Sequence, residues 1–345
     1  MSNESKHMIY GLKNGNLVSI DEVDKGLQCD CICPACGEKL IAKKGEKRVH
    51  HFAHISGNSC EYGYETSLHM AAKDIISKAQ LFVIPEVYVE FPDSYKSKEL
   101  IANAKVIDID NVMIEHKIDS IKPDIIIESA GKLLMIEIYV THKVDEIKLN
   151  KIKSLGISTI EIDLSKCEGN ITPKILEEKI VYGISEKQWI YNTIADACLQ
   201  NFIYCSEILP VRKRGLAIHV DNCPIKSRVW KGKSYANFID NCLYCEYCIS
   251  RSHPDGIICS GREAISKYKD FKIPKEERIK NRNDFYNEKR EVAFYGGTCP
   301  YCRGSIRKIN GPYGLFWSCS NYKNCAFKVN PKHNTDIPDL SVLYI

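Results

Sequence analysis

The chain has 345 residues, 17 cysteines and a formal net charge of only +4 at pH 7, which by itself predicts no particular partner. This length allows two or three domains, each with a core of its own. No apolar run is typical of a signal peptide or reaches the roughly 20 residues of a membrane span, so we expect a cytoplasmic protein with no membrane partner and with reduced thiols free to bind metal.

Residues 1–64 contain four candidate metal ligands. Cys33 and Cys36 form a Cys-x2-Cys pair, which is followed after seventeen residues by His54 and after five more by Cys60. Zinc prefers four thiolate or imidazole ligands in a tetrahedron, and a short Cys-x2-Cys turn supplies two of them. The spacing therefore predicts an N-terminal zinc ribbon held by these four side chains.

Residues 65–185 alternate between helix and strand patterns. Apolar residues at helical spacing predict one helix over 65–80 and another over 144–155, where Gly156 ends it. A further helix is expected to begin near Pro173. Strands are expected over 82–91, 105–109, 124–127, 132–140 and 158–164. This order predicts an α/β core of ordinary domain size.

Residues 186–270 are expected to form a helix over 186–208, followed by a cysteine-rich module over 223–261. Four cysteines of this module are predicted to bind zinc: Cys223, Cys242, Cys245 and Cys259. The run Cys242-x2-Cys245-x2-Cys248 also resembles the start of a ferredoxin-like motif, so an iron–sulfur cluster is the alternative. Zinc is favoured because the fourth ferredoxin cysteine is missing and the other two sites have zinc-like spacing.

Residues 271–295 belong to a run dense in both signs of charge, which is expected to be a solvated linker or an exposed helix. Residues 296–345 repeat the pattern of the first ribbon: Cys299 and Cys302 are followed after sixteen residues by Cys319 and after five more by Cys325. Both segments also have a glycine nine residues after the second cysteine and an aromatic residue two before the third ligand. We expect about three structural zinc ions per chain.

The last ribbon also combines aromatic and basic side chains. Bases stack on exposed aromatic rings, and Lys and Arg bind phosphate, so this composition predicts a surface for single-stranded DNA. The candidate contacts are Arg303, Arg307, Lys308, Trp317, Tyr322 and Lys323. The alternative is that the aromatic residues form the small core of the ribbon, which is favoured for Phe316 and Phe327.

Two carboxylates of the central core are candidates for a catalytic metal site. Asp124 opens one expected strand, and Glu137 lies thirteen residues later in the next. Paired strands can bring two such groups to one divalent ion, and oxygen ligands suit Mg²⁺ or Mn²⁺. A charged Glu in so apolar a strand is costly unless it is paired or bound to metal. The alternative is a structural Glu that pairs with Lys or Arg at the sheet edge.

Several motifs resemble a known family. Pro123-Asp124, a hairpin and Glu137 within a helix–strands–helix–strand order resemble the PD-(D/E)XK nuclease superfamily. The runs 33–36 (Cys-Pro-Ala-Cys), 51–54 (His-Phe-Ala-His) and 65–73 resemble competence protein CoiA-like proteins, which join a zinc-binding segment to this nuclease fold. The resemblance implies a restriction-endonuclease-like core in which Asp124 and Glu137 are metal ligands and Glu65 assists them. The last ribbon resembles the zinc ribbons of bacterial type I topoisomerases, which bind single-stranded DNA.

One residue departs from the superfamily pattern. Tyr139 stands where the superfamily has a lysine that orients the attacking water, and a phenol cannot replace that cation. Lys143 and Lys148, at the start of the next helix, are candidates to supply the ammonium, and His142 is another. The leading hypothesis is a Mg²⁺- or Mn²⁺-dependent deoxyribonuclease. The alternatives are an inactive nuclease fold that binds single-stranded DNA, and a phage-defence nuclease that a protein partner or ligand activates.

Overall fold

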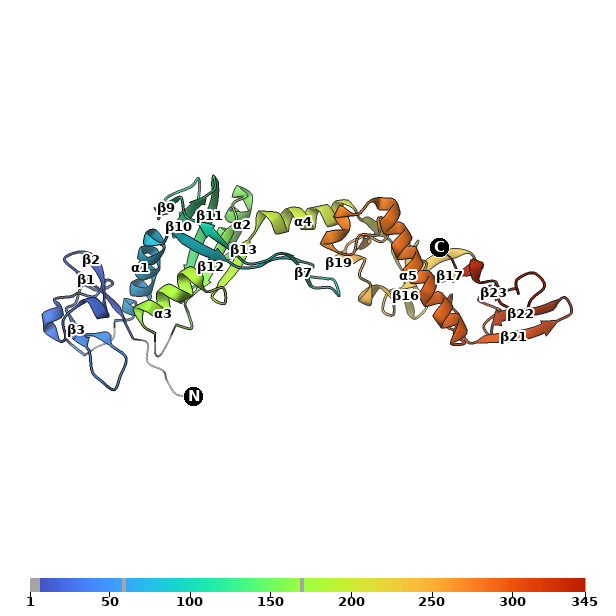
Figure 1. Ribbon diagram of the computed structural model, residues 1–345, viewed down its shortest axis with the longest axis horizontal. Coiled ribbons are helices and arrows are strands. Elements are labelled where there is room, and N and C mark those ends of the chain that lie inside the picture. Colours follow the sequence, from blue (N-terminus) through green and yellow to red (C-terminus); the bar gives the residue numbers. More distant parts are fainter. Residues whose placement is uncertain (1–6, 58–59, 168–170, 345) are drawn as a thin grey trace. The chain divides into compact units, whose positions relative to one another are not determined.

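The computed structural model describes residues 7–57, 60–167 and 171–344, and the chain divides into two compact units (Figure 1). Unit 1 consists of Met1–Val87 and Ala102–Asp196, and unit 2 consists of Tyr88–Ile101 and Ala197–Ile345. In the described ranges we find no helix that combines the length and the apolar character needed to cross a bilayer.

Unit 1 begins with two small antiparallel hairpins and a long helix. The hairpins pair β1 (Tyr10–Lys13) with β2 (Asn16–Ser19) and β3 (Leu40–Lys43) with β4 (His51–His54). Helix α1 (Gly63–Lys78) follows, and its apolar residues at helical spacing, Leu68, Ala71, Ala72 and Ile76, are all buried. The helix predicted over 65–80 is therefore confirmed.

A five-stranded mixed sheet forms the rest of unit 1. Its strand order is β13-β12-β11-β10-β9, and only β11 and β12 run parallel. The crossover between these two strands is α2, as a parallel pair requires. The bounds are β9 (Asn111–Ile114), β10 (Ile125–Ser129), β11 (Lys132–Tyr139), α2 (Glu146–Leu155), β12 (Thr159–Asp163) and β13 (Lys187–Tyr191). Beside it lie the pair β5 (Leu81–Ile84) and β8 (Lys105–Asp108), and the short helix α3 (Pro173–Glu177).

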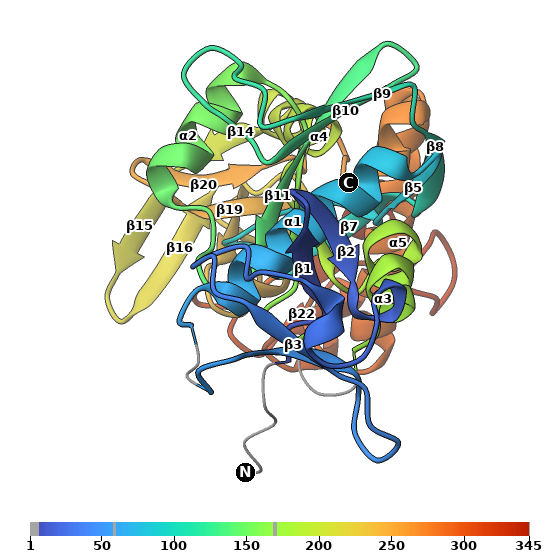
Figure 2. The ribbon, with the colours of Figure 1, turned by 90° about the vertical axis from the view of Figure 1, so that its left-hand side faces the viewer.

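Helices cover both faces of this sheet. Alternate strand residues such as Ile136 and Ile160 pack with α1, in one buried cluster that also includes Ile9 and Leu40 of the first hairpins. The other face carries Met135, which packs with Ile152 of α2 and the rest of a second cluster. Figure 2 shows α1 in front of β11, on the side opposite α2 in Figure 1. The N-terminal module and the sheet therefore share one core.

Two predicted elements differ in the structure. The expected strand 82–91 is split into β5 and β6 (Val87–Glu90), and the start of the helix expected over 186–208 is strand β13. Helix α4 (Thr193–Tyr204) begins only after Asn192, whose Oδ1 accepts hydrogen bonds from the N–H groups of Ile194 and Ala195 at 3.0 Å each. The prediction of helix at Trp189 was wrong because it counted apolar spacing and missed this N-cap.

Unit 2 contains the two-stranded β6–β7 hairpin, three sheets of three or four strands and a long helix. The β6–β7 hairpin, with β7 at Lys98–Ala102, packs Val89 and Phe91 against Phe202 of α4. The sheet orders are β14-β20-β19, β15-β16-β18-β17 and β21-β22-β23. The strands are β14 (Glu207–Leu209), β15 (Val211–Arg214), β16 (Ala217–Asp221), β17 (Arg228–Trp230), β18 (Lys233–Asn237), β19 (Cys248–His253), β20 (Gly256–Cys259), β21 (Ile306–Gly311), β22 (Gly314–Cys319) and β23 (Lys328–Val329).

The charged segment expected over 271–295 forms helix α5 (Lys275–Tyr295). Of the two possibilities left by the sequence, the structure therefore has a helix. It is not wholly exposed, because Arg282, Arg290 and Phe294 are buried on one side. Three buried residues along 21 residues of otherwise polar sequence leave too weak an apolar pattern to indicate packing.

Lys187 gives unit 1 a pH-dependent stability. Its side chain is buried, its Nζ donates to the carbonyls of Val83 (2.7 Å) and Val181 (3.0 Å), and burial lowers its pKa to about 7 against a small opposing effect of Glu186. Above pH 7 the folded protein loses this proton while the unfolded chain keeps it up to about pH 10.4, so stability rises with pH in this window.

We therefore expect wild-type protein to gain about 2 to 3 kcal/mol of unfolding free energy relative to Lys187→Met between pH 6.5 and pH 9. Urea unfolding of both proteins at the two pH values measures this difference. The comparison cancels the pH dependence of all other groups. A difference that does not change with pH would show that Lys187 is charged in the folded protein.

Candidate metal centres and acidic site

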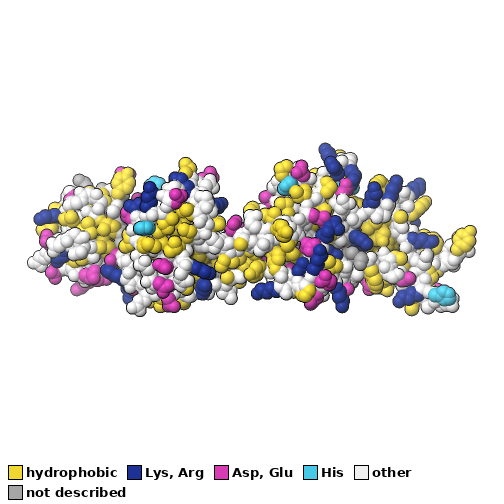
Figure 3. Space-filling view, turned by 90° about the horizontal axis from the view of Figure 1, so that it is seen from above, with side chains coloured by type: hydrophobic (Ala, Val, Ile, Leu, Met, Phe, Trp, Pro, Cys, Tyr) yellow, Lys and Arg dark blue, Asp and Glu magenta, His cyan; other side chains and the backbone are white. Residues whose placement is uncertain are grey.

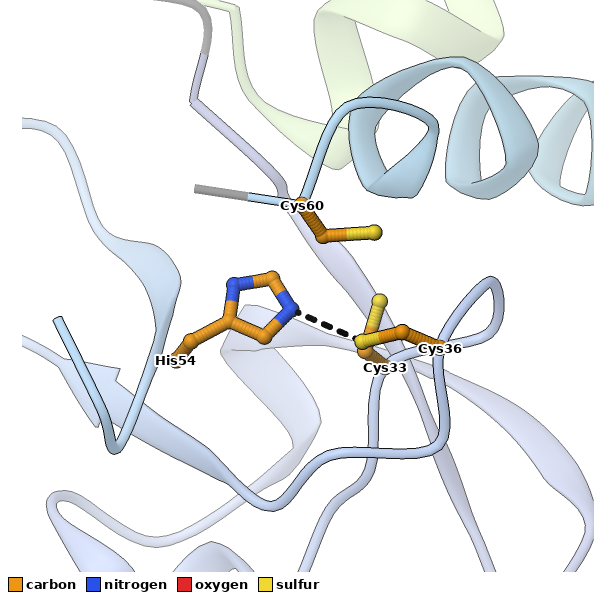
Figure 4. Close-up of side chains that lie close together, drawn as sticks. All are labelled: Cys33, Cys36, His54 and Cys60. Atoms are coloured by element: carbon orange, nitrogen blue, oxygen red, sulfur yellow. Dashed lines mark hydrogen bonds between the residues drawn. The ribbon is translucent and has the colours of Figure 1, made fainter. Parts of the chain in front are cut away.

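The N-terminal ligand set comes together as the spacing predicts. The ligand atoms of Cys33, Cys36, His54 and Cys60 all lie within 4.8 Å of one another, and Cys36 Sγ is 3.4 Å from His54 Nε2. Figure 4 shows the four side chains pointing toward one centre from the loop before β3, the end of β4 and the turn before α1. This donor set fits a tetrahedral zinc ion.

The tetrad lies directly against the first residue of α1. A Cβ on Gly63, the first residue of the helix, would lie 3.2 Å from Cys33 Sγ, so a larger residue would crowd the sulfur. Burial raises the pKa of Cys33 to about 11, whereas the N–H of Glu38 lowers the pKa of Cys36. The helix that carries Glu65 therefore starts directly on the metal site.

The C-terminal tetrad has the same character. The sulfurs of Cys299, Cys302, Cys319 and Cys325 lie within 4.8 Å of one another, with 3.8 Å between Cys299 and Cys325 and 3.3 Å between Cys302 and Cys319. Backbone N–H groups two residues later donate to two of the sulfurs: Gly304 to Cys302 at 3.4 Å and Asn321 to Cys319 at 3.3 Å. Such bonds orient metal ligands and stabilise thiolate charge.

The predicted central ligands are arranged less tightly. Cys223, Cys242, Cys245 and Cys259 line one small cavity together with Cys248. Within residues 7–57, 60–167 and 171–344, only the two terminal tetrads bring three or more His, Cys, Asp or Glu ligand atoms within 4.8 Å of one another. The carboxylates of Glu65, Asp124 and Glu137 likewise form no group at that spacing.

Asp124 lies at the start of β10 and is held by three neighbours. Its Oδ2 accepts the Ile138 N–H at 3.0 Å and lies 3.8 Å from His69 Nδ1, and its Oδ1 is 2.9 Å from Lys73 Nζ. Lys73 also contacts Glu115 at 2.9 Å. Burial opposes the charge on Lys73, but its hydrogen bonds to Asp124 and Glu115 raise its pKa. Both oxygens of Asp124 therefore have partners.

Glu137 is the most unusual carboxylate of the chain. It is only 3% exposed, its Oε2 accepts from Lys148 Nζ at 2.6 Å, and its Oε1 is buried with no hydrogen-bond partner in the described ranges. Burial raises the pKa of Glu137 to about 7, although Lys148 acts in the opposite direction. An orphaned, buried carboxylate oxygen beside a second acid is where a missing cation is expected.

The other predicted catalytic residues lie at different distances from this pair. Glu65 of α1 accepts from Thr141 Oγ1 at 2.5 Å and lies 3.8 Å from His142 Nδ1. Lys143 Nζ lies over the Tyr139 ring, 5.2 Å from its centre. Of the two candidate lysines, the structure pairs Lys148 with Glu137 and places Lys143 on the tyrosine that replaces the superfamily lysine.

Three neighbours of the site were not predicted: Glu161, Gln188 and Lys73. Glu161 of β12 is directly opposite Glu137 in the parallel register and is 2% exposed. Its Oε1 accepts from Gln188 Nε2 at 2.6 Å, and its Oε2 from the Val144 N–H at 3.2 Å. Lys73 is the third. A signal for Glu161 was present in the run Ile160-Glu161-Ile162-Asp163, where acids alternate with buried isoleucines.

The structure places two aromatic residues of the C-terminal ribbon differently from the prediction. Trp317 lies on the face that packs into the ribbon core, and Phe316 lies on the opposite face. Trp317 is paired with Lys308 and Val329 and packs at 6.2 Å from Phe294, on the face that holds the ribbon core. The opposite face carries Arg307 and Phe316, with Lys328 Nζ 4.6 Å from the centre of the Phe316 ring. Phe327 is buried, as predicted, whereas Phe316 is only half-buried. Arg303, Arg307, Lys308, Tyr322 and Lys323 are exposed.

Two cysteine-rich tetrads, one near each end of a mixed α/β chain, define a protein with two sites that could bind zinc. Comparison with known families agrees. Residues 17–63 match the competence protein CoiA N-terminal domain, and residues 296–334 match the topoisomerase DNA binding C4 zinc finger. The two resemblances predicted for the chain ends are thereby confirmed. No curated protein and no solved structure matches the chain.

Proposed function

We propose that this protein binds DNA through its C-terminal ribbon and hydrolyses phosphodiester bonds at the Asp124–Glu137 site with Mg²⁺ or Mn²⁺. The observation that carries the proposal is Glu137, a 3% exposed carboxylate with one unpartnered oxygen and an ammonium 2.6 Å from the other. A buried acid of this kind needs a cation, and the neighbouring Asp124 makes the site doubly acidic.

The residues present suit this chemistry. Glu137 Oε1 and Asp124 would hold a divalent ion, which when bound polarises a phosphodiester and activates water. Lys148, which contacts Glu137, would orient the attacking water and stabilise the charge that develops on phosphate, the role of the superfamily lysine. Glu65, held by Thr141 beside the site, would position a second water. The core 65–185 would then be restriction-endonuclease-like.

A second candidate is a DNA-binding protein whose nuclease fold does not cut. Lys73 favours it, because its ammonium lies 2.9 Å from Asp124 Oδ1 and neutralises the acid that would bind metal. Tyr139 favours it too, because it removes the usual cation from β11. The match of the N-terminal domain to the competence protein CoiA supports DNA handling under either candidate.

A cleavage assay with the full chain separates the two. Labelled single-stranded and duplex DNA should be cut in Mg²⁺ or Mn²⁺ and left intact in EDTA under the nuclease proposal. DNA that is bound but never cut in any divalent metal would support the second candidate. Cleavage that appears only after addition of cell extract would indicate an activating partner.

The proposed DNA contact is the face of the C-terminal ribbon that carries Arg307 and Phe316, opposite the ribbon core. Figure 3 shows many Lys and Arg side chains over unit 2, and topoisomerase ribbons of this type are named for DNA binding. Phe316 offers a half-exposed ring on the same face as Arg307 and Lys328. The six sequence-predicted contacts stay in the proposal, but Trp317 is expected to act mainly through the ribbon core.

Phe316→Ala should weaken single-stranded DNA binding about 5- to 150-fold, because a stacked base contributes about 1–3 kcal/mol. Arg307→Ala should lower the slope of log K against log salt by about 0.7, because one phosphate contact is lost. Asn310→Ala, on the other face of β21, is the matched control and should bind like wild type. Fluorescence anisotropy at several salt concentrations measures all three. Unchanged binding in both variants would place the DNA elsewhere.

A further inference from the structure

Five cysteines of unit 2 gather around one enclosed space. Cys223 follows β16, Cys242 and Cys245 flank the turn after β18, Cys248 begins β19 and Cys259 ends β20. All five line a cavity of about 20 Å³, whose other walls are largely apolar. A space of this size holds little more than one water-sized particle, and thiols do not offer water the partners it needs.

Two of these sulfurs have the backbone environment of the C-terminal zinc ligands. The Gly261 N–H donates to Cys259 Sγ at 3.4 Å, and the Tyr247 N–H donates to the Cys245 sulfur. Each donor is two residues after its cysteine, as for Cys302 and Cys319. Gly261 also matches Gly304: a Cβ there would lie 3.2 Å from Cys259 Sγ, and one on Gly304 would lie 3.3 Å from Cys302 Sγ.

Helix α5 adds two buried positive charges beside the same cysteines. Arg282 is 8% exposed and donates to the Gly261 carbonyl, two residues after Cys259. Arg290 is 7% exposed and donates to the Ile225 carbonyl, two residues after Cys223. In the part of the chain that the structure describes, neither guanidinium forms an ion pair with a carboxylate. Buried charges need counter-charges, so these two arginines call for negative charge in the cavity.

We propose that Cys223, Cys242, Cys245 and Cys259 hold one zinc ion and that Arg282 and Arg290 balance its thiolates. Four thiolates around Zn²⁺ leave two net negative charges, and the two positive charges of the guanidinium groups neutralise them. Arg282 and Arg290 each donate a hydrogen bond to the backbone of a loop that carries one cysteine, Cys259 and Cys223 respectively. For this reason we assign these two cysteines to the ligand set. Cys248 is the spare thiol, with its sulfur 3.9 Å from the Ser250 carbonyl.

The same observations argue against an iron–sulfur cluster. A cubane core adds eight atoms to its cysteine sulfurs, so the cysteines around a cavity of about 20 Å³ would have to rearrange more to hold a cluster than to hold a single ion. All five cysteines line this cavity, although no three of their sulfurs lie within 4.8 Å of one another, so the ligands would move closer together when the ion binds. The charged helix α5 thus acquires a role as the outer wall of a metal module.

Metal analysis of the purified full chain tests the proposal. Wild type should contain three zinc ions and no iron, Cys245→Ser two, and Cys248→Ser three. Cys245→His keeps a ligand should the serine variant not fold: it should retain three metals and, loaded with cobalt, show weaker thiolate-to-cobalt absorption than wild type. Two zinc ions in wild type, or iron with visible absorbance after anaerobic purification, would overturn the proposal.

The arginines have a separate test. Arg282→Gln with Arg290→Gln should release one of the three zinc ions to a competing chelator at least about tenfold faster, as expected for loss of outer-shell partners of a metal ligand. Lys280→Gln, an exposed position on the same helix, should release zinc like wild type. Equal release by all three proteins would show that the guanidinium groups do not balance a metal site.

Discussion

Cys302→Ser should lose one zinc ion per chain and unfold the C-terminal ribbon, while unit 1 stays folded. The apolar core of the ribbon is small, consisting mainly of Phe294, Phe327, Val329, Leu340 and Leu343 around the cysteines. A core of this size does not stabilise a module alone, and metal binding contributes roughly 10 kcal/mol or more in zinc fingers. The effect is therefore expected to be all-or-none rather than a graded loss of stability.

Zinc content and limited proteolysis measure this outcome. Cleavage sites should appear across residues 296–344 in the variant and in chelator-treated wild type. Cys205→Ser is the matched control, because Cys205 packs in a different cluster of unit 2 and belongs to neither tetrad. A folded, protease-resistant ribbon without its zinc would show that the four cysteines are structural thiols.

The terminal metal sites could be predicted from sequence because each is nearly local. In each module a Cys-x2-Cys turn fixes two ligands, and the second strand of the hairpin that follows it delivers the third. The spacing of Cys33, Cys36, His54 and Cys60 therefore carries most of the geometry. The central set was less determined, since the run Cys242-x2-Cys245-x2-Cys248 together with Cys223 and Cys259 offers five cysteines for four positions, and the choice among them depends on tertiary contacts, here those of α5.

Some contacts of the acidic site could be predicted from the sequence and others could not. Asp124 and Glu137 are hairpin neighbours, so their proximity follows from local pairing. Lys73, by contrast, reaches Asp124 from α1, and Glu161 meets Glu137 only through the parallel register of β11 and β12. Such partners depend on a crossover and on helix packing, which residue patterns do not specify. The choice between Lys143 and Lys148 was open for the same reason.

The predicted type of element was wrong where residues that favour a strand also stand at helical spacing. Lys187 to Tyr191 combine Trp, Ile and Tyr, which favour a strand, with apolar positions that also fit a helix. This segment forms a strand because it pairs with β12 at the edge of the sheet. In α5 the two buried arginines looked like solvated charge, because nothing in the sequence shows that the cysteine module lies against them.

Glu137→Gln should lower metal-dependent DNA cleavage by about 10³-fold or more, because it removes the negative charge of the carboxylate whose buried Oε1 has no hydrogen-bond partner in the described residues. Zinc content and DNA affinity should stay at wild-type values, since neither ribbon is touched. The folded protein should be no less stable, because Gln keeps the volume of Glu137 and removes a charge that is only 3% exposed. A cleavage assay in Mn²⁺ with matched protein concentrations measures the loss.

The lysines separate an active enzyme from an inactive fold. Lys148→Ala should lower cleavage about 10²- to 10³-fold, because its ammonium contacts Glu137 at 2.6 Å, whereas Lys143→Ala should change it little, because Lys143 lies over Tyr139. If wild type does not cut, Tyr139→Lys restores a cation on β11, and Lys73→Met frees Asp124 for metal. Cleavage gained by that double variant would identify a nuclease fold that lost its chemistry through these two positions. Wild-type cleavage that survives Glu137→Gln would place the active site elsewhere in the chain.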